Sequence, residues 1–369
     1  MSRTDMRPRP HPNPYLGAPR STPLADDHAV DLRGDALVGC RVALVVCGGI
    51  ASFKAPLTVR ALRRQGADVT VFASTDALRY VAEDTLAWAS LHPVVTRLSP
   101  QAEHLSGAAP FDVYLVAPAT YNTINKLAVG IADNVPTTLL ASALGRCERG
   151  EAAVLVAPTM HGTMHNRVLH DNLVRLTELG VRVIPPRDAY GKDNIPDEPV
   201  LVAEVAAARP RAPLRGRRVV VIGGPFRDIH GRISAEHTAL DGGTRIAEDL
   251  IHQGAQVLHL SLPTPCPLSA ISEPVVRDTP EALAALVADT LHSDDWDMVI
   301  DCTDITPLFP LPESWSAIHI RPAGHRWLLD GPCMSATEVA VPRAVAHFND
   351  VLGVIRTRLL DCVPRRPSA

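Results

Sequence analysis

Residues 41–74 read RVALVVCGGIASFKAPLTVRALRRQGADVTVFAS, and this stretch decides the fold. It opens with an apolar, β-branched run that ends in two glycines, which is typical of a buried strand and its exit turn. The segment that follows places four apolar residues on one helical stripe and stops at Gly66, where a second apolar run begins; the four are Ile50, Phe53, Leu57 and Ala61. The order strand, helix, strand at this spacing predicts two parallel strands joined by a crossover helix.

The same alternation continues through the first half of the chain. Apolar runs at residues 111–120, 152–158 and 181–186 predict three further strands, and residues 121–144 have a helical pattern. We therefore expect an α/β domain at residues 38–204, built on a doubly wound parallel sheet with helices on both faces. In such sheets, ligands bind beyond the carboxyl ends of the strands.

A change of composition separates the two halves. Residues 205–217 are basic, rich in proline and without periodicity, so they predict a linker. Residues 218–369 return to the α/β pattern and predict a second, Rossmann-like domain, in which residues 318–322 and 325–331 are candidate strands. Residues 337–361 predict a pair of helices, or one helix that is kinked at a proline.

The composition bounds the class of protein. Hydrophobic residues make up 46% and charged residues 21% of the 369 residues, and the net charge of -4 gives no reason to expect nucleic acid or an acidic membrane as a partner. No apolar run approaches the roughly 18 residues that a membrane helix needs. Residues 1–37 are rich in arginine and proline and lack the apolar core of a secretory signal, so we expect a disordered or loosely attached extension.

The seven cysteines indicate a reducing compartment. Their number is odd, none forms a CxxC pair, and several lie inside apolar runs. Reduced thiols in a cytoplasmic protein fit this pattern better than a disulfide framework does.

A glycine turn follows the first expected strand. Gly48 and Gly49 stand where the strand gives way to a helix, and the exposed N–H groups of such a helix start favour a phosphate. Ser52 can add a hydroxyl, and Ser74, at the end of the next strand, can add a second one. The motif alone is also compatible with a tight turn that binds nothing.

Residues 117–134, APATYNTINKLAVGIADN, place a second polar cluster at a strand end. Pro118 fixes the turn, and Thr120, Asn122 and Thr123 put polar side chains where the helix begins. One alternative is a helix cap at Thr120, although a cap needs only one such residue.

Residues 157–166, APTMHGTMHN, form a third motif. His161 and His165 are four residues apart and would share one face of a helix. With His170 they could form a metal site, but no acidic residue or cysteine lies nearby at ligand spacing, so no metal is expected. The other interpretations are an ordinary loop and a substrate clamp.

In this order and at these spacings, the three motifs resemble the flavin-dependent cysteine decarboxylase family, which includes phosphopantothenoylcysteine decarboxylase and the lantibiotic peptidyl-cysteine decarboxylases. The resemblance covers roughly residues 38–205. Residues 214–310 are similar, more distantly, to the phosphopantothenate–cysteine ligase domain of bifunctional enzymes. The resemblance implies a flavodoxin-like first domain, FMN as cofactor, and a homo-oligomer built from trimers that place the flavin at a subunit boundary.

The resemblance also implies roles for single residues. His104, just before the third expected strand, takes the place of the catalytic base, although without the family it would be interpreted as a histidine of a surface loop. Asn122 belongs to the active-site motif, and Met160 and Met164 are expected at the substrate. The residues expected to bind FMN are Gly48, Gly49, Ile50, Ser52, Ser74, Pro118, Ala119, Thr120 and Thr123.

Two departures from the family bear on the substrate and the product. His161 replaces an asparagine that holds the substrate carboxylate, and His165 replaces a tryptophan; a protonated His161 can still bind a carboxylate. The coenzyme A enzymes carry a loop cysteine that returns a proton to the intermediate. The corresponding residues 188–199 hold no cysteine and retain only Glu198 and Pro199 of that motif, so the enethiol is the expected product.

The second domain departs further from its family. The Asn-His-Ser-Ser-Gly-Lys run of the ligases is replaced by EHTALDGG at residues 236–243, where Asp241 stands near the lysine position. We therefore expect a degenerate ligase-like domain that serves assembly or the docking of a partner.

The resemblance thus implies FMN-dependent oxidative decarboxylation of a cysteine-derived thiol carboxylate. The substrate thiolate would be oxidised to a thioaldehyde, CO2 would leave, and an enethiolate would remain. We expect a small-molecule, carrier-bound or peptide cysteine as substrate, in specialised metabolism of, for example, the dithiolopyrrolone type. The alternatives are a bifunctional decarboxylase and ligase of coenzyme A biosynthesis, and a flavin-binding regulatory subunit without catalysis.

Overall fold

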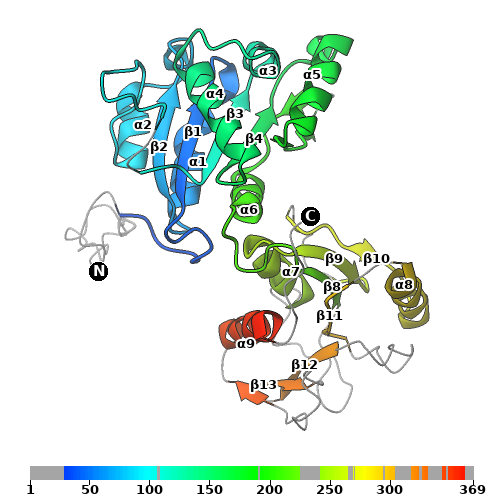
Figure 1. Ribbon diagram of the computed structural model, residues 1–369. Coiled ribbons are helices and arrows are strands. Elements are labelled where there is room, and N and C mark those ends of the chain that lie inside the picture. The colour runs from blue at the N-terminus through cyan, green and yellow to red at the C-terminus, as the bar shows by residue number, and fades with distance from the viewer. Residues whose placement is uncertain are drawn as a thin grey trace, which may run out of the picture.

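The computed structural model shows two α/β units, one above the other in Figure 1. Each unit contains a β-sheet with helices packed against it. The structure describes residues 29–105, 109–189, 192–224, 242–264, 269, 271–293, 296–303, 317–323, 326–330, 343–345 and 348–361.

The first sheet has five parallel strands in the order β2-β1-β3-β4-β5, as predicted. Its strands are nearly continuous apolar runs because both faces are covered by helices. The carboxyl ends of neighbouring strands meet at one edge, since Val46 of β1 pairs with Ala73 of β2. The strands are β1 (Arg41–Val46), β2 (Asp68–Ala73), β3 (Val113–Ala119), β4 (Ala153–Pro158) and β5 (Arg182–Val183).

Three helices cover each face of this sheet. Helices α1, α2 and α6 share one buried cluster with Leu44 of β1, and helices α3, α4 and α5 share another with Val45. The sheet is therefore doubly wound, as the sequence predicts. The helices are α1 (Ala55–Arg63), α2 (Glu83–Ser90), α3 (Tyr121–Ala128), α4 (Val135–Glu148), α5 (Arg167–Glu178) and α6 (Glu198–Ala208), with 3-10 turns η2 (Ile50–Lys54), η3 (Ala77–Arg79) and η4 (Gly162–Met164).

The buried stripe of the first helix differs from the prediction. Ile50, Phe53 and Leu57 are 72%, 57% and 54% exposed, whereas Val59 and Leu62 are fully buried against the sheet. The segment carries two apolar stripes, and a periodicity of 3.6 residues does not say which of them faces the core. Of the predicted stripe, Ala61 packs against the core, whereas Ile50, Phe53 and Leu57 form an exposed apolar surface.

Residues 121–144, which have a helical pattern throughout, form two helices with a break between them. Gly130 has a φ of 75° after the end of α3, and Asn134 starts α4 with a capping box. The side chain of Asn134 accepts a hydrogen bond from the Thr137 N–H at 3.1 Å, and the Thr137 hydroxyl accepts one from the Asn134 N–H at 3.1 Å.

The Asn134→Ala variant is expected to lower the free energy of unfolding by about 1 kcal/mol, because the first turn of α4 loses a hydrogen-bond acceptor. Urea denaturation followed by circular dichroism measures this change. Asn134→Ser keeps a capping oxygen and serves as the control. Equal stability of the Ala and Ser variants would show that the capping box does not stabilise the helix.

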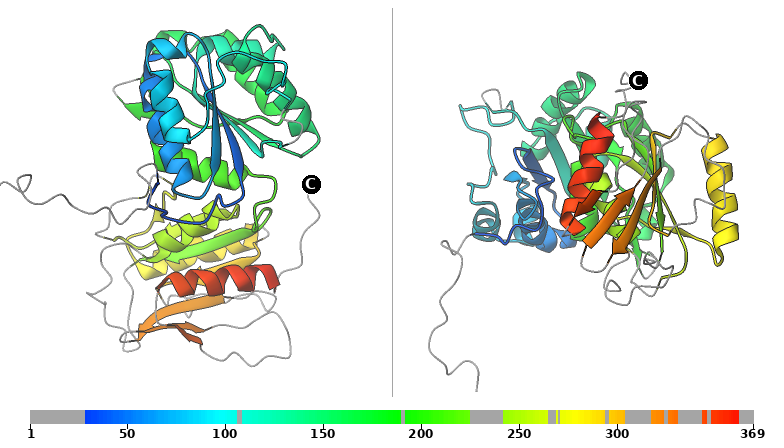
Figure 2. Two further views of the ribbon diagram at one scale, coloured as in Figure 1. Left: turned by 90° about the vertical axis from the view of Figure 1, so that its left-hand side faces the viewer. Right: turned by 90° about the horizontal axis from the view of Figure 1, so that it is seen from below.

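The second sheet has seven strands in the order β10-β9-β8-β11-β12-β13-β14. Helices α7 and α9 pack on one face and α8 on the other, as the two views of Figure 2 allow the reader to follow. The elements are β8 (Arg218–Gly223), α7 (Gly242–His252), β9 (Gln256–Ser261), β10 (Val275–Val276), α8 (Pro280–Ser293), β11 (Met298–Asp301), β12 (Ala317–Ala323), β13 (Arg326–Asp330), β14 (Arg343–Val345) and α9 (Phe348–Asp361).

The C-terminal part of this sheet confirms two expected strands and corrects a helix. β12 and β13 form an antiparallel pair, and β13 pairs with β14 through Trp327 and Val345. The helix predicted from residue 337 therefore begins only at Phe348, because residues 343–345 add a strand to the sheet. Pro342, where a kink was expected, lies outside the described residues.

The junction between the two units is packed more tightly than the composition suggests. Helix α6 runs to Ala208, and Val205 is fully buried in the core of the first sheet, so the predicted linker begins inside a helix. Leu214 is also fully buried, and its N–H donates to the Gln253 carbonyl at 2.8 Å. Figures 1 and 2 show α6 and α7 between the two sheets.

The N-terminal boundary also shifts relative to the prediction. Residues 1–28 lie outside the described part, but Leu37 is fully buried in the first core, and the Arg33 N–H donates to the Arg64 carbonyl at 2.8 Å. The last residues of the expected extension therefore belong to the fold. None of the described helices has the length and apolar character that crossing a membrane requires.

Candidate active site

The three sequence motifs meet at the carboxyl edge of the first sheet. The glycine turn follows β1, Ser74 follows β2, Thr120 follows β3, and Met160 lies just beyond β4. The Thr159 N–H donates to the Ala119 carbonyl at 3.1 Å, which ties the second motif to the third. This edge is the place where parallel α/β sheets bind their ligands.

The glycine turn leaves no space for side chains. A Cβ atom on Gly48 would lie 2.4 Å from the Cβ atom of Asp76, and a Cβ atom on Gly49 would lie 3.3 Å from the Thr120 methyl group. The turn therefore brings bare backbone to the edge of the sheet, as the cradle of a phosphate group requires. Ile50, which follows it, is largely exposed.

The two serines that were expected at the phosphate stabilise the turns themselves. Ser52 is fully buried and donates its hydroxyl to the Cys47 carbonyl at 2.6 Å. The Ser74 hydroxyl accepts a hydrogen bond from the Ala77 N–H at 3.1 Å. Ser52 thus faces the protein interior, whereas Ser74 is half-buried at the carboxyl edge of the sheet.

The second motif surrounds a buried thiol. Pro118, after a cis peptide bond, and Ala119 are both buried. The Thr120 hydroxyl makes no capping bond to α3 and lies 3.2 Å from the Thr123 hydroxyl, so the cap alternative does not explain it. Burial raises the pKa of Cys47 to about 11, and hydrogen bonds with Thr123 and Thr120 offset part of this effect.

Two candidate catalytic side chains differ in their surroundings. Asn122 is exposed on the first turn of α3. His104 is half-buried in the segment before β3, where the sequence places it. Its Nδ1 atom is buried and has no hydrogen-bond partner among the described residues. A buried nitrogen without a partner costs free energy unless a ligand or a water satisfies it.

The third motif is joined to a short hairpin of β6 (Arg187–Ala189) and β7 (Lys192–Asn194). The Met160 N–H donates to the Asp193 carbonyl at 3.2 Å, and His165 forms an ion pair with the Asp193 carboxylate. Met160 is buried, while Met164 is 40% exposed. Asp193 therefore fixes the hairpin on the loop that carries both methionines.

The histidines of this motif do not converge on a metal site. His161 is exposed, and its Nδ1 accepts a hydrogen bond from the Thr163 N–H at 3.3 Å. His165 pairs with Asp193, and His170 lies 3.4 Å from the Asp171 carboxylate. No group of three or more metal-binding side chains occurs within the described ranges.

The sequence analysis missed two residues that shape the site. Asp193 follows His165 by 28 positions, and no local pattern connects them. Lys54, the last residue of the glycine motif, lies 3.4 Å from Asp197 Oδ1 and 3.8 Å from Glu198 Oε1. These ion pairs explain a retained Glu198, because they tie the helix after the glycine turn to the start of α6.

We expect Asp193→Asn to raise the KM for the thiol carboxylate about two- to fivefold, because the partly exposed ion pair with His165 is lost and the hairpin is held less firmly. The flavin content is expected to stay unchanged. Steady-state kinetics and the rate of proteolysis within residues 187–194 measure the effect. Asp171→Asn, which removes an exposed carboxylate beside His170, is the control; identical kinetics in the two variants would exclude this role of Asp193.

A comparison with known protein families identifies one family that this arrangement of strands and motifs matches. The family model described as Flavoprotein matches residues 33–209, which include the whole first sheet and all three motifs. Residues 33–209 match the flavoprotein family. FMN is the cofactor of this flavoprotein domain, and the bare glycine turn at Gly48 and Gly49 suits the phosphate of that cofactor.

Relatives of the flavoprotein domain include larger proteins. The chain is 30% identical over 272 residues to the coenzyme A biosynthesis bifunctional protein CoaBC of Thermococcus kodakarensis, and 31% identical over 285 residues to that of Bacillus subtilis. Each alignment covers 72% of this chain and 66% of the relative. The chain thus spans just under two thirds of the length of these relatives.

Two solved structures that are similar to part of this chain are FMN-dependent cysteine decarboxylases. The FMN-dependent cysteine decarboxylase SpaF is 23% identical, with a TM-score of 0.40, and covers 45% of this chain and 95% of its own. The FMN-dependent cysteine decarboxylase TvaF from thioviridamide biosynthesis is 27% identical, with a TM-score of 0.35, and covers 40% of this chain and 90% of its own.

Proposed function

We propose that the flavoprotein domain decarboxylates a cysteine-derived thiol carboxylate with FMN as the electron acceptor. The observation that carries the proposal is the meeting of three motifs at one edge of a flavoprotein-family sheet. The glycine turn offers backbone for the phosphate, and His104, in the segment before β3, offers a buried nitrogen without a hydrogen-bond partner among the described residues. This combination favours an enzyme over a flavin-binding regulatory subunit.

The residues of this chain position the substrate and move its protons. When bound, FMN accepts electrons from the substrate sulfur. His104 takes a proton from the reacting thiol. Asn122 and His161, both exposed at the sheet edge, bind the carboxylate. Pro118, Ala119, Thr120 and Thr123 support the flavin, and Met160 and Met164 exclude water around the reacting group.

The product of the proposed reaction depends on the hairpin. The sequence of residues 188–199 contains no cysteine that could return a proton to the intermediate. An enethiol is therefore the proposed product, and the reduced flavin passes its electrons to another acceptor.

The names of the relatives favour coenzyme A biosynthesis over specialised metabolism as the pathway of this reaction. Both are named coenzyme A biosynthesis bifunctional proteins, and their alignments are longer than the family match at residues 33–209, so they extend into the second unit. A substrate of the phosphopantothenoylcysteine type is therefore better supported than a dithiolopyrrolone or peptide precursor. Residues 236–241 of the run on which the prediction of a degenerate ligase rests lie outside the described residues.

Mass spectrometry of the reaction products tests both parts of the proposal. The FMN-loaded protein is incubated with 4′-phosphopantothenoylcysteine and, separately, with a peptide that ends in cysteine. We expect the loss of CO2 together with two hydrogens, which marks the enethiol. Loss of CO2 alone would overturn the enethiol product, and no turnover of either compound would overturn the decarboxylase. ATP- or CTP-dependent coupling of cysteine would support the bifunctional alternative.

We also infer that the protein forms homo-oligomers. Ile50 and Phe53 beside the glycine turn are more than half exposed, and exposed large apolar side chains next to a ligand site favour a covering partner. Light scattering coupled to gel filtration measures the mass; a monomer at all concentrations would contradict this inference. A cytoplasmic location stays a prediction from the cysteines, of which Cys40, Cys47, Cys147 and Cys302 are free thiols.

A further inference from the structure

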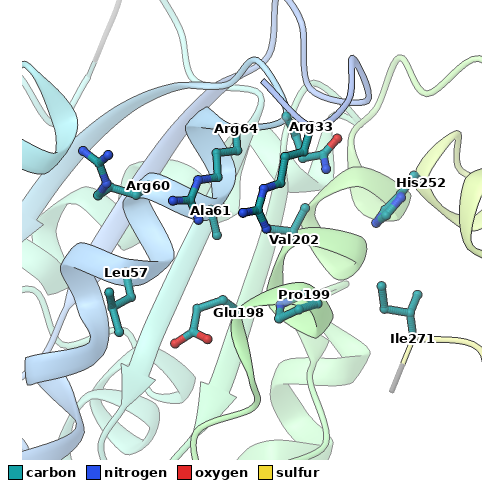
Figure 3. Close-up of a pocket in the computed structure, with 11 residues that line it drawn as sticks. Arg33, Leu57, Arg60, Ala61, Arg64, Glu198, Pro199, Val202, His252 and Ile271 are labelled. Carbon is teal, nitrogen blue, oxygen red and sulfur yellow. The ribbon is translucent and has the colours of Figure 1, made fainter. Parts of the chain in front are cut away.

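A cavity lies between the two α/β units, away from the glycine turn. Its volume is about 350 Å³, and its lining comes from α1, from the start of α6, from Arg33 and, on the side of the second unit, from His252 and Ile271 (Figure 3). Helix α1 leads from the glycine turn to this cavity. Arg64 lies ten residues beyond Lys54, which corresponds to roughly 15 Å along a helix.

The cavity carries more positive than negative charge. Arg33, Arg60 and Arg64 line it, and Glu198 is the carboxylate among its lining residues. None of the three guanidinium groups forms an ion pair with a carboxylate in the described part of the chain. Glu198 itself lies 3.8 Å from Lys54, so its charge is already shared.

Other carboxylates near the junction are engaged elsewhere. Asp197 pairs with Lys54 at 3.4 Å and with Arg187 at 3.5 Å. Asp249 and Asp35 pair with the guanidinium group of Arg356. The lining therefore carries three arginines and one carboxylate, Glu198, and this excess of positive charge favours the binding of an anion.

Several nitrogen atoms around the cavity also lack acceptors. Arg60 Nη1, Arg64 Nε and His252 Nε2 are buried and have no hydrogen-bond partner among the described residues. Arg60 stacks on Trp88, with its guanidinium carbon 4.6 Å from the ring centroid, and this contact leaves its in-plane donors unused. Buried donors without acceptors are rare in native proteins, so each is a position where a water or a bound group can supply an oxygen atom.

The side chains of Arg33 and Arg64 are oriented toward a common space, whereas the Arg60 guanidinium group points away from them toward Trp88. Figure 3 shows the guanidinium groups of Arg33 and Arg64 near each other between α1 and α6, with the Glu198 carboxylate below them. His252 and Ile271 lie on the opposite side of the same space. A planar guanidinium group presents paired donors that match two oxygen atoms of a phosphate, and two such groups can bind one phosphate from different sides.

The rest of the lining selects an organic ligand rather than a bare ion. Leu57, Pro199, Val202 and Ile271 give the cavity apolar walls, and its volume is at the lower end of the range of about 300–1,000 Å³ that small-molecule sites occupy. The Glu198 carboxylate can accept a hydrogen bond from a hydroxyl or amino group. We propose that this cavity is a binding site for a small organic phosphate, distinct from the flavin site, with its phosphate on Arg33 and Arg64 and its organic part on the apolar walls.

Calorimetry on the full-length, FMN-saturated protein tests the proposal. Saturation with FMN keeps the probes out of the flavin site. The probes are AMP, which combines a phosphate, hydroxyl groups and an apolar ring, then adenosine, which lacks the phosphate, and inorganic pyrophosphate. We expect AMP to bind, adenosine not to bind measurably, and pyrophosphate to compete with AMP.

The variants locate the binding. The double variant Arg33→Gln/Arg64→Gln is expected to weaken AMP binding at least about tenfold, because it removes two charged donors from the phosphate. Arg175→Gln, on the exposed side of α5, removes one positive charge far from the cavity and is expected to bind AMP as the unchanged protein does. Arg64→Lys keeps the charge and loses the paired donors, so an intermediate affinity is expected.

Two results would overturn the proposal. One is equal affinity for AMP in the double variant and the unchanged protein, with flavin content and circular dichroism intact in both. The other is the absence of binding by AMP and pyrophosphate together with a lower oligomer mass of the double variant in light scattering, which would assign the arginines to contacts between copies of the chain. Should the double variant fail to fold, the Arg64→Lys variant decides the question on its own.

Discussion

Turnover of the thiol carboxylate is expected to fall by about two to four orders of magnitude when His104 is replaced by asparagine, while FMN stays bound. The expectation follows from the position of the side chain. His104 is half-buried in the segment before β3, and its Nδ1 has no partner among the described residues. Asparagine fills a similar space and can form hydrogen bonds, but it cannot take up a proton at neutral pH.

Product formation followed by mass spectrometry measures this effect, and the flavin absorbance of the same samples reports cofactor binding. His170→Asn changes an exposed histidine on α5 and is the matched control. If the His104 variant retains the turnover of the control, His104 takes no part in the reaction. If it loses both flavin and turnover, its role is to support the cofactor site.

Gly48→Ala is expected to weaken FMN binding by roughly five- to a hundredfold, which corresponds to about 1–3 kcal/mol of steric strain. The added methyl group would lie 2.4 Å from Asp76 Cβ and 3.1 Å from the Asp76 carbonyl carbon. Neither atom is the flexible end of a long side chain, so the backbone of the turn has to move. A displaced turn no longer presents its N–H groups to the phosphate.

Gly49→Ala introduces the same methyl group at a less crowded position of the same turn, so it serves as the comparison for Gly48→Ala. Its methyl group would meet only the Thr120 methyl group, at 3.3 Å, and its φ of -159° is accessible to alanine. Fluorescence titration of the flavin-free protein with FMN gives both dissociation constants. We expect Gly49→Ala to bind FMN more tightly than Gly48→Ala. The reverse order would show that the approach of Asp76 does not control the shape of the turn.

The parallel sheet and the edge that carries the motifs could be predicted from the sequence. Strands β1 to β5 are covered on both faces, so they appear as continuous apolar runs that are short and easily recognised. The polar residues that follow them must lie at one edge, because all five strands run in the same direction. The glycine turn and the polar residues after Pro118 are therefore placed by topology alone.

Features that depend on contacts between distant segments could not be predicted. The apolar stripe of α1 that faces the sheet could not be identified from periodicity, because the helix also carries Val59 and Leu62, which are the fully buried residues. The ion pair of His165 with Asp193 joins residues with no local pattern in common. The cavity between the units combines Arg33 with residues of α1, α6 and α7, and only the packing of the two sheets brings these charges together.

Helix α6 determines where the chain can be divided into two fragments that are produced separately. Its residues Leu201, Val202, Val205 and Ala206 belong to the core of the first sheet, although composition alone places the boundary at residue 205. A truncation at that boundary would remove the last turn of α6 from the flavin-binding fragment. The apolar core residues that this turn covers would then be exposed to water. The smallest fragment with an intact interior therefore extends at least through Ala208, which matches the end of the family match at residue 209.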